Sequence, residues 1–400
     1  MGFDSVMDSE GDTMEETTNS TEGPNPSYAY RVTNRVLKHI NRYYFRSRFI
    51  NFDEPLEPTP TGAPRIYASN HSGMAFPWDG ISFATGMLER SGYRVEESIR
   101  PLATPLLSKT PLMSPFLVPD FWERLGAIPA TMKDFEASMQ QEGTNLLIYP
   151  EGIDGIGKGF NKRYQLQNIA TSLIRMSIKY KSDIVPVATV GAEYINPLSY
   201  SVKWLNRISQ KAGIPFIPVG PSLGLVLFQP WMLYFALPAQ LTFVRGTPFK
   251  AYEMVDGRDL EDVSEEEILS IRDALARLLQ EVIDESVEMY GGKPFDLLGL
   301  LKTWKENSNK WHLFMPPFWP ALFWENDRFN EEHAMPLMED PTDLHEAQQL
   351  IDQVIPADGD NLPTLGSLAK TIKELPGLLS LNIPGFGLLS LARGEIPGLA

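Results

Sequence analysis

The middle of the chain alternates short apolar runs with amphipathic segments. Apolar runs rich in β-branched and aliphatic residues predict strands at 65–69, 126–130, 145–149, 184–190 and 239–245. Apolar residues three and four positions apart predict helices at 80–90, 132–141, 168–180 and 265–290. Because strands and helices alternate, we expect an α/β fold with a mixed, largely parallel central sheet flanked by helices. In such sheets, sites form at the carboxyl ends of strands.

Before this region, residues 28–49 predict a helix with an unusual basic face. Basic residues recur along it at spacings of three and four, namely Arg31, Arg35, Lys38, Arg42 and Arg46. An apolar stripe follows the same helix. Two interpretations are open: the helix lies in a membrane interface, or it is a surface helix that packs its apolar stripe on the core.

The net charge of −16 is concentrated in the two ends of the chain. Residues 1–26 hold seven acids and no Lys or Arg, and residues 325–360 hold eleven acids and one Arg. Acidic polar segments of this kind are usually solvated and disordered. We therefore divide the chain into an acidic disordered tail at 1–26, a main domain at 27–292, an aromatic and Pro-rich extension at 293–324, and an acidic linker with a Leu/Pro/Gly-rich tail at 325–400.

Composition excludes several kinds of site. The chain has no Cys, which rules out disulfides, a thiolate zinc site and a cysteine nucleophile. Its N-terminus lacks the basic region and apolar core of a signal peptide, and it has no run of eighteen apolar residues that predicts a spanning helix. Residues 214–238 are uncharged and rich in Pro, Gly and aromatic residues. This segment is core, a membrane-dipping loop or an acyl-chain wall.

The candidate chemistry follows two of the predicted strands. His71 comes directly after strand 65–69, Asp79 lies eight positions later, and Glu151 follows strand 145–149. A histidine base with an orienting carboxylate can activate an acceptor hydroxyl, which is then the nucleophile of an acyl transfer. The alternative from these residues alone is an ordinary turn histidine and a helix-capping aspartate.

Four short blocks in order decide between these interpretations. They are Asn70-His71 with Asp79, Gly126-Ala127-Ile128-Pro129, Tyr149-Pro150-Glu151-Gly152, and Ile184-Val185-Pro186-Val187. Together they resemble the glycerolipid acyltransferase superfamily, the PlsC-like 1-acylglycerol-3-phosphate acyltransferases. The resemblance covers residues 28–290 and does not extend to the two tails.

The resemblance implies an enzyme that moves a fatty acyl group from acyl-CoA or acyl carrier protein to a hydroxyl of a glycerolipid such as lysophosphatidate. It implies peripheral attachment to the cytoplasmic side of a membrane, with no bound cofactor, no metal and no nucleic-acid partner. His71 would be the base and Asp79 its partner, while Glu151 and Gly152 would organise the acceptor site. The backbone N–H groups of Ser72 and Gly73 are candidates for binding the oxyanion.

Two departures from the family pattern affect these expectations. Seven residues separate His71 from Asp79 where the family usually has four, and Pro77 prevents a continuous helix between them, so the segment must loop. The family turn usually continues with Thr-Arg, whose Arg holds the acceptor phosphate, but here Asp154 stands in the Arg position. Either Lys158, Lys162 and Arg163 replace that Arg, or the acceptor has no phosphate and is a diacylglycerol or a long-chain alcohol.

Two other function classes are open. Residues 152–159 nearly match the phosphate-binding loop G-x-x-x-x-G-K-[ST], but Gly159 stands where that motif needs a hydroxyl for magnesium. A lipid-binding relative that has lost catalysis would account for the displaced Asp79. The presence of both His71 and Glu151 favours the enzyme.

Overall fold

A computed structural model of the chain describes residues 24–375, except 74–75, 106, 108–112, 142, 211–216, 222–223, 225–229, 339, 341–342 and 360. The predicted acidic tail lies almost wholly outside the described residues. The last part of the Leu/Pro/Gly-rich tail and much of segment 214–238 also lie outside the described residues.

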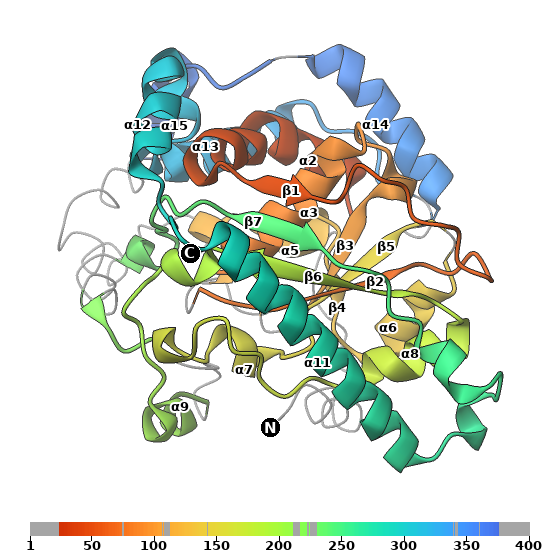
Figure 1. Ribbon diagram of the computed structural model, residues 1–400. Coiled ribbons are helices and arrows are strands. Elements are labelled where there is room, and N and C mark those ends of the chain that lie inside the picture. Colours follow the sequence, from red (N-terminus) through yellow and green to blue (C-terminus); the bar gives the residue numbers. More distant parts are fainter. Residues whose placement is uncertain are drawn as a thin grey trace.

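A seven-stranded sheet forms the centre of the described part of the chain, with the order β1-β7-β6-β2-β5-β3-β4 (Figure 1). The strands are β1 (Arg48–Ile50), β2 (Ile66–Ser69), β3 (Ile99–Ala103), β4 (Ile128–Pro129), β5 (Asn145–Ile148), β6 (Ile184–Val190) and β7 (Thr242–Arg245). Neighbouring strands are parallel except for β6 and β7, which are antiparallel. The predicted mixed, largely parallel sheet is confirmed.

Apolar side chains of the inner strands point alternately to the two faces of the sheet, so both faces are apolar. Ile66 and Ala68 of β2 pack in a core with the side chains of α6 (Met132–Met139), α8 (Ser172–Tyr180) and α11 (Glu265–Tyr290). Tyr67, between them, belongs to a second core with α3 (Trp78–Arg90) and the N-terminal helix. Successive side chains of a strand point to opposite faces, so both faces of β2 must be covered by helices.

The helix predicted at 28–49 is present but ends earlier. It runs through α2 (Pro26–Val32) and two π-helical turns at Thr33–Leu37 and Ile40–Phe45. Arg46 then adopts a left-handed conformation (φ 50°), and the chain enters β1. The guanidinium of Arg46 donates to the carbonyls of Pro238 and Phe295, which holds the chain at this change of direction.

The prediction that this helix presents a basic face to a membrane is wrong for Arg31 and Arg35. Each of these residues is only 2% exposed. Arg31 Nε lies 2.6 Å from Asp358 Oδ2, and Arg35 Nη2 lies 2.7 Å from Glu325 Oε2. The apolar stripe packs on the core, as the alternative interpretation expects, but this is not a surface helix, because the C-terminal part of the same chain covers its basic side.

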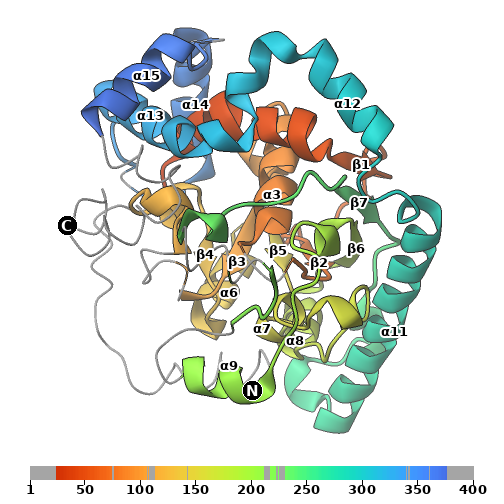
Figure 2. The ribbon, with the colours of Figure 1, turned by 90° about the vertical axis from the view of Figure 1, so that its left-hand side faces the viewer.

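The C-terminal part of the described chain is helical. It contains α12 (Leu297–Glu306), α13 (Trp319–Glu332), α14 (Leu344–Asp358) and α15 (Leu365–Glu374). Figures 1 and 2 show α13 and α14 beside the N-terminal helix. The acids expected at 325–360 to form a solvated linker include Glu325, Asp327 and Asp358, which are buried against arginines. In the described residues, no helix is long and apolar enough to cross a membrane.

Candidate active site

Asn70 fixes the position of His71 at the carboxyl end of β2. The Asn70 side chain donates to the Thr189 carbonyl (3.0 Å) and accepts from the Thr189 N–H (2.8 Å). These two bonds extend the pairing of β2 with β6 by one residue beyond the strand. The chain then leaves the sheet in a turn at residues 70–73, here called the histidine turn, as the placement after strand 65–69 predicts.

His71 and Asp79 form a partly buried hydrogen-bonded pair. Nδ1 of His71 lies 2.7 Å from Oδ2 of Asp79, whose side chain is fully buried. The Ser72 N–H donates to the same oxygen (3.1 Å), and the Gly80 N–H donates to Oδ1 (2.8 Å). Asp79 is the second residue of α3, so the positive end of the helix dipole also stabilises its carboxylate.

The pair fixes the protonation pattern of the imidazole. An ionised carboxylate only accepts hydrogen bonds, so Nδ1 of His71 carries the proton and Nε2 has a free lone pair. No described residue bonds to Nε2, and the side chain is 12% exposed. His71 can therefore accept a proton through Nε2 from a group that enters from solvent.

Buried apolar side chains between His71 and Asp79 bring the two residues together despite the long spacing. Phe76 and Trp78 are each 1% exposed, and their rings lie 5.5 Å apart. Trp78 Nε1 also donates to the carbonyl of Tyr234 (2.9 Å). These contacts fix the start of α3 beside the end of β2, so the predicted partnership forms without a continuous helix.

Tyr149 lies against the face of the histidine. Its ring stacks on that of His71 at 4.0 Å with an interplanar angle of 24°. Burial, with a smaller contribution from Asp79, raises the pKa of the Tyr149 phenol well above its ordinary value, so the ring is neutral. Tyr149 was not among the predicted site residues, although its place in the Tyr149-Pro150-Glu151-Gly152 block was the available signal.

Glu151 holds the backbone of the histidine turn. Its Oε1 accepts the N–H of His71 (3.1 Å), and its Oε2 accepts the N–H of Gln167 (2.7 Å). Burial raises the pKa of Glu151, while Lys158 and these two N–H groups act in the opposite direction. Gly155 must be a glycine here, because a Cβ at that position would lie 2.7 Å from Cβ of Glu151. Glu151 therefore positions His71, and Gly152 (φ 56°) provides the turn that leads away from it.

Lys158 is buried between two carboxylates. Its Nζ lies 3.3 Å from Oε1 of Glu193 and 3.8 Å from Oε2 of Glu151. Glu193 Oε1 also accepts the hydroxyl of Ser72 (2.7 Å) and the N–H of Tyr164 (2.9 Å). Segment 158–167, here called the strap, is thus tied to the histidine turn through Glu151 and Glu193. Glu193 was not among the predicted site residues, although it lies only six positions after the Ile184-Val185-Pro186-Val187 block.

These contacts change three of the expected roles. Lys158 is occupied by carboxylates, so its position supports neither phosphate binding nor the phosphate-loop alternative. The N–H of Ser72 is occupied by Asp79, which leaves Gly73 as the oxyanion candidate of the two. Lys162 and Arg163 are exposed, with Lys162 Nζ donating to Gln167 Oε1 (3.2 Å) and Arg163 lying over the ring of Phe160.

Comparisons with known proteins give distant likenesses. No family model matches the chain. An uncharacterized protein of Mycobacterium leprae is 26% identical over 235 residues, 56% of this chain and 61% of that protein. Uncharacterized proteins of Mycobacterium bovis and Mycobacterium tuberculosis are each 25% identical over 233 residues, 55% of this chain and 62% of theirs. The match thus spans about three fifths of the length of these relatives.

Among solved structures, the chain is similar to the 1-acyl-sn-glycerophosphate acyltransferase PlsC of Thermotoga maritima. The identity is 16% and the TM-score is 0.32. The match covers 64% of this chain and 80% of that one.

Proposed function

We propose that this protein transfers a fatty acyl group from an acyl thioester to a hydroxyl group of a lipid. The observation that carries the proposal is the 2.7 Å contact between Nδ1 of His71 and the buried carboxylate of Asp79. It leaves Nε2 as a base at the carboxyl end of a central strand, where a substrate hydroxyl can reach it. The ordered blocks around His71, Glu151 and Ile184 support the same reaction class.

In the proposed reaction, Nε2 of His71 removes the proton of the acceptor hydroxyl as its oxygen attacks the thioester carbonyl. Asp79 stabilises the imidazolium that results. The tetrahedral intermediate then expels the thiolate, which takes the proton from the imidazolium, so an ester and a free thiol are the products. No covalent acyl-enzyme is needed, in keeping with a chain that has no Cys. The Gly73 N–H is the candidate donor to the oxyanion.

The charges around His71 favour an acceptor without a phosphate. The carboxyl groups of Asp79, Glu151 and Glu193 surround the histidine turn, and Lys158 is the cation buried with them. A dianionic phosphate beside these carboxyl groups would be repelled, since none of the described arginines presents its guanidinium fork to the histidine turn. A diacylglycerol or a long-chain alcohol is therefore the preferred acceptor. Lysophosphatidate is the second candidate, because Lys162 and Arg163 are exposed on the strap.

Peripheral contact with a membrane belongs to the same proposal, since the acceptor is a lipid. Helix α9 (Lys203–Gln210) carries Trp204, 64% exposed, and Ile208, 57% exposed, four positions apart on one face. The segment before it joins the strap, because the Phe160 N–H donates to the Ser199 carbonyl (2.8 Å). Figures 1 and 2 place α9 at the same end of the molecule as α7 (Ile153–Ile156), which follows Glu151.

The donor is acyl-CoA or acyl carrier protein, and the proposed steps use no metal or bound cofactor.

The experiment is an acyl-transfer assay with the purified full chain. Isotope-labelled palmitoyl-CoA, or the same acyl group on carrier protein, is supplied with vesicles that contain diacylglycerol, hexadecanol, lysophosphatidate or no acceptor. Mass spectrometry of the lipids should show labelled ester with diacylglycerol or hexadecanol. Ester on lysophosphatidate alone would overturn the preferred acceptor. Absence of ester with every acceptor and both donors would overturn the proposed function.

A further inference from the structure

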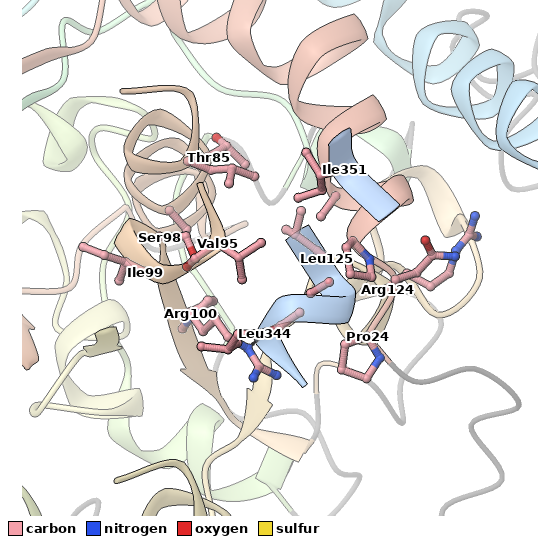
Figure 3. A pocket seen from close by; sticks show the side chains of 18 of the residues that line it. Pro24, Thr85, Val95, Ser98, Ile99, Arg100, Arg124, Leu125, Leu344 and Ile351 are labelled. Carbon is pink, nitrogen blue, oxygen red and sulfur yellow. Dashed lines mark hydrogen bonds between the residues drawn. The ribbon is translucent and has the colours of Figure 1, made fainter. Parts of the chain in front are cut away.

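A cavity of about 90 Å³ lies away from the histidine turn, among α3, β3 and α14. Figure 3 shows Val95, Ile99 and Arg100 on one side of it and Leu125, Leu344 and Ile351 on the other. Most of the lining is apolar. The charged residues of the lining are Arg100, the second residue of β3, and Arg124.

Arg100 has an incomplete set of partners. Its Nε–H donates to the carbonyl of Gly126 (2.9 Å), and no other described residue accepts a hydrogen bond from this guanidinium or forms an ion pair with it. Burial lowers the pKa of Arg100 to about 10, so the group remains charged at neutral pH. The residue is partly exposed, and four of its five guanidinium N–H groups have no acceptor among the described residues, so they can donate to a ligand that enters the cavity.

Three buried arginines on this side of the molecule, in contrast, each pair with a carboxylate. Arg124 lines the same cavity, but its Nη1 lies 2.6 Å from Asp327 Oδ1 and its guanidinium lies over the Tyr28 ring. Arg31 and Arg35 likewise have Asp358 and Glu325. The described part of the chain thus supplies a carboxylate to each of these three arginines and none to Arg100.

We propose that the cavity is a binding site for a short-chain aliphatic monocarboxylate, with its carboxylate on Arg100 and its alkyl chain against the apolar lining. The guanidinium fork matches a carboxylate in a two-bond geometry. A single cation balances a monoanion, whereas a phosphate dianion would keep an uncompensated charge among apolar side chains.

The size of the cavity limits the length of the chain that fits. An apolar cavity of about 150 Å³ accommodates benzene. A cavity of about 90 Å³ is smaller and suits an alkyl chain of about three or four carbons. The proposal does not depend on the proposed acyl transfer, because Arg100 and the cavity lining take no part in it.

The test measures binding of butanoate to the full-length protein. Carboxyl-labelled butanoate is titrated by NMR, and the melting temperature is recorded with sodium butanoate, with sodium chloride at equal ionic strength, and with butan-1-ol. We expect saturable binding and a rise of about 2–4 °C at twentyfold excess over the dissociation constant, from butanoate alone. Inorganic phosphate should produce no comparable rise.

Two variants test the two halves of the site. Arg100→Met removes the charge and should weaken butanoate binding at least about tenfold, while Arg94→Gln, which removes an exposed guanidinium nearby, should not. Ala347→Leu fills the cavity from α14 and should also abolish binding with Arg100 intact. No binding by the native protein, equal stabilisation by butan-1-ol, or unchanged binding by Ala347→Leu would each overturn the proposal.

Discussion

Lys158 Nζ lies 3.3 Å from Oε1 of Glu193, and this buried contact links the strap to the turn that carries the base. The same oxygen accepts the hydroxyl of Ser72, one residue after His71. Glu151 makes the parallel link, from the His71 N–H to the Gln167 N–H. The position of the imidazole thus depends on two buried carboxylates and the lysine between them. This arrangement predicts how the protein responds when the lysine is removed.

Replacing Lys158 by Met should destabilise the fold strongly. Glu151 and Glu193 would be left buried without a cation, and breaking such a group typically costs about 3–5 kcal/mol. Urea unfolding at pH 7 measures the change. The matched control is Lys162→Met on the same strap, where the lysine is exposed and the loss should be below about 1 kcal/mol. Similar small losses in both variants would mean that Lys158 is not the required counter-charge.

Breaking the ion pair between Arg35 and Glu325 should also lower the free energy of unfolding. Arg35→Met leaves Glu325 buried and unpaired, and we expect a loss of about 3–5 kcal/mol in unfolding free energy. Adding Glu325→Gln should restore part of it, since the stranded charge is then gone. Arg42→Met is the control, because the Arg42 side chain is 58% exposed in its pair with Glu89. A double variant less stable than Arg35→Met would contradict this account.

His39 should make the protein acid-sensitive. Burial, with smaller contributions from nearby cations, lowers the pKa of His39 to about 3, and neither ring nitrogen has a partner among the described residues. The unfolded chain takes up this proton near pH 6.5 and the folded chain only near pH 3, so stability falls as the pH decreases across that window.

Replacing His39 by Phe isolates this contribution. The stability of His39→Phe relative to the native protein should rise by about 1.4 kcal/mol for each pH unit below 6.5. Chemical denaturation between pH 7 and pH 4.5 measures the difference. His345→Gln, at an exposed histidine of α14, should leave the native pH dependence unchanged. A His39→Phe curve parallel to the native one would show that His39 titrates normally in the fold.

Helix α9 should carry the contact with lipid. Trp204→Glu combined with Ile208→Glu removes two exposed apolar side chains, each of which contributes about 1.5–3 kcal/mol when it is fully buried. Co-sedimentation with vesicles should weaken at least about tenfold. Leu298→Glu on α12, where Leu298 is 84% exposed, is the control for an apolar surface residue elsewhere. If only Leu298→Glu released the protein, the membrane-contacting surface would be α12.

Local patterns sufficed for the elements whose signals are uninterrupted. β6 and α11 have the predicted bounds because one is a continuous apolar run and the other has a capping box formed by Ser264 and Glu267. β3 was missed because Arg100 and Pro101 interrupt its apolar run. The end of the N-terminal helix was placed too late because Arg46 is turned by carbonyls that come from distant segments.

The candidate site was predictable as a set of residues but not as a set of roles. His71 and Asp79 were paired from their types and position, and the structure places them in contact. Lys158 was expected to face an acceptor phosphate, since nothing in the linear sequence indicates that Glu193 folds against it. The burial of the basic side of the first helix could not be predicted for a similar reason, because Arg35 and its partner Glu325 are 290 positions apart. Long-range charge pairing is a property of the fold, and composition does not reveal it.

The central claim is that Nε2 of His71 is the base for acyl transfer, and one rate tests it most directly. His71→Gln cannot accept the hydroxyl proton, so the rate of labelled ester formation at saturating acyl thioester and acceptor should fall by about 100-fold or more. Its melting temperature should stay within a few degrees of the native value, because the imidazole reaches the surface and the contacts that change are its bond to Asp79 and its stacking on Tyr149. Ester formation at the native rate by the folded His71→Gln protein would contradict the claim.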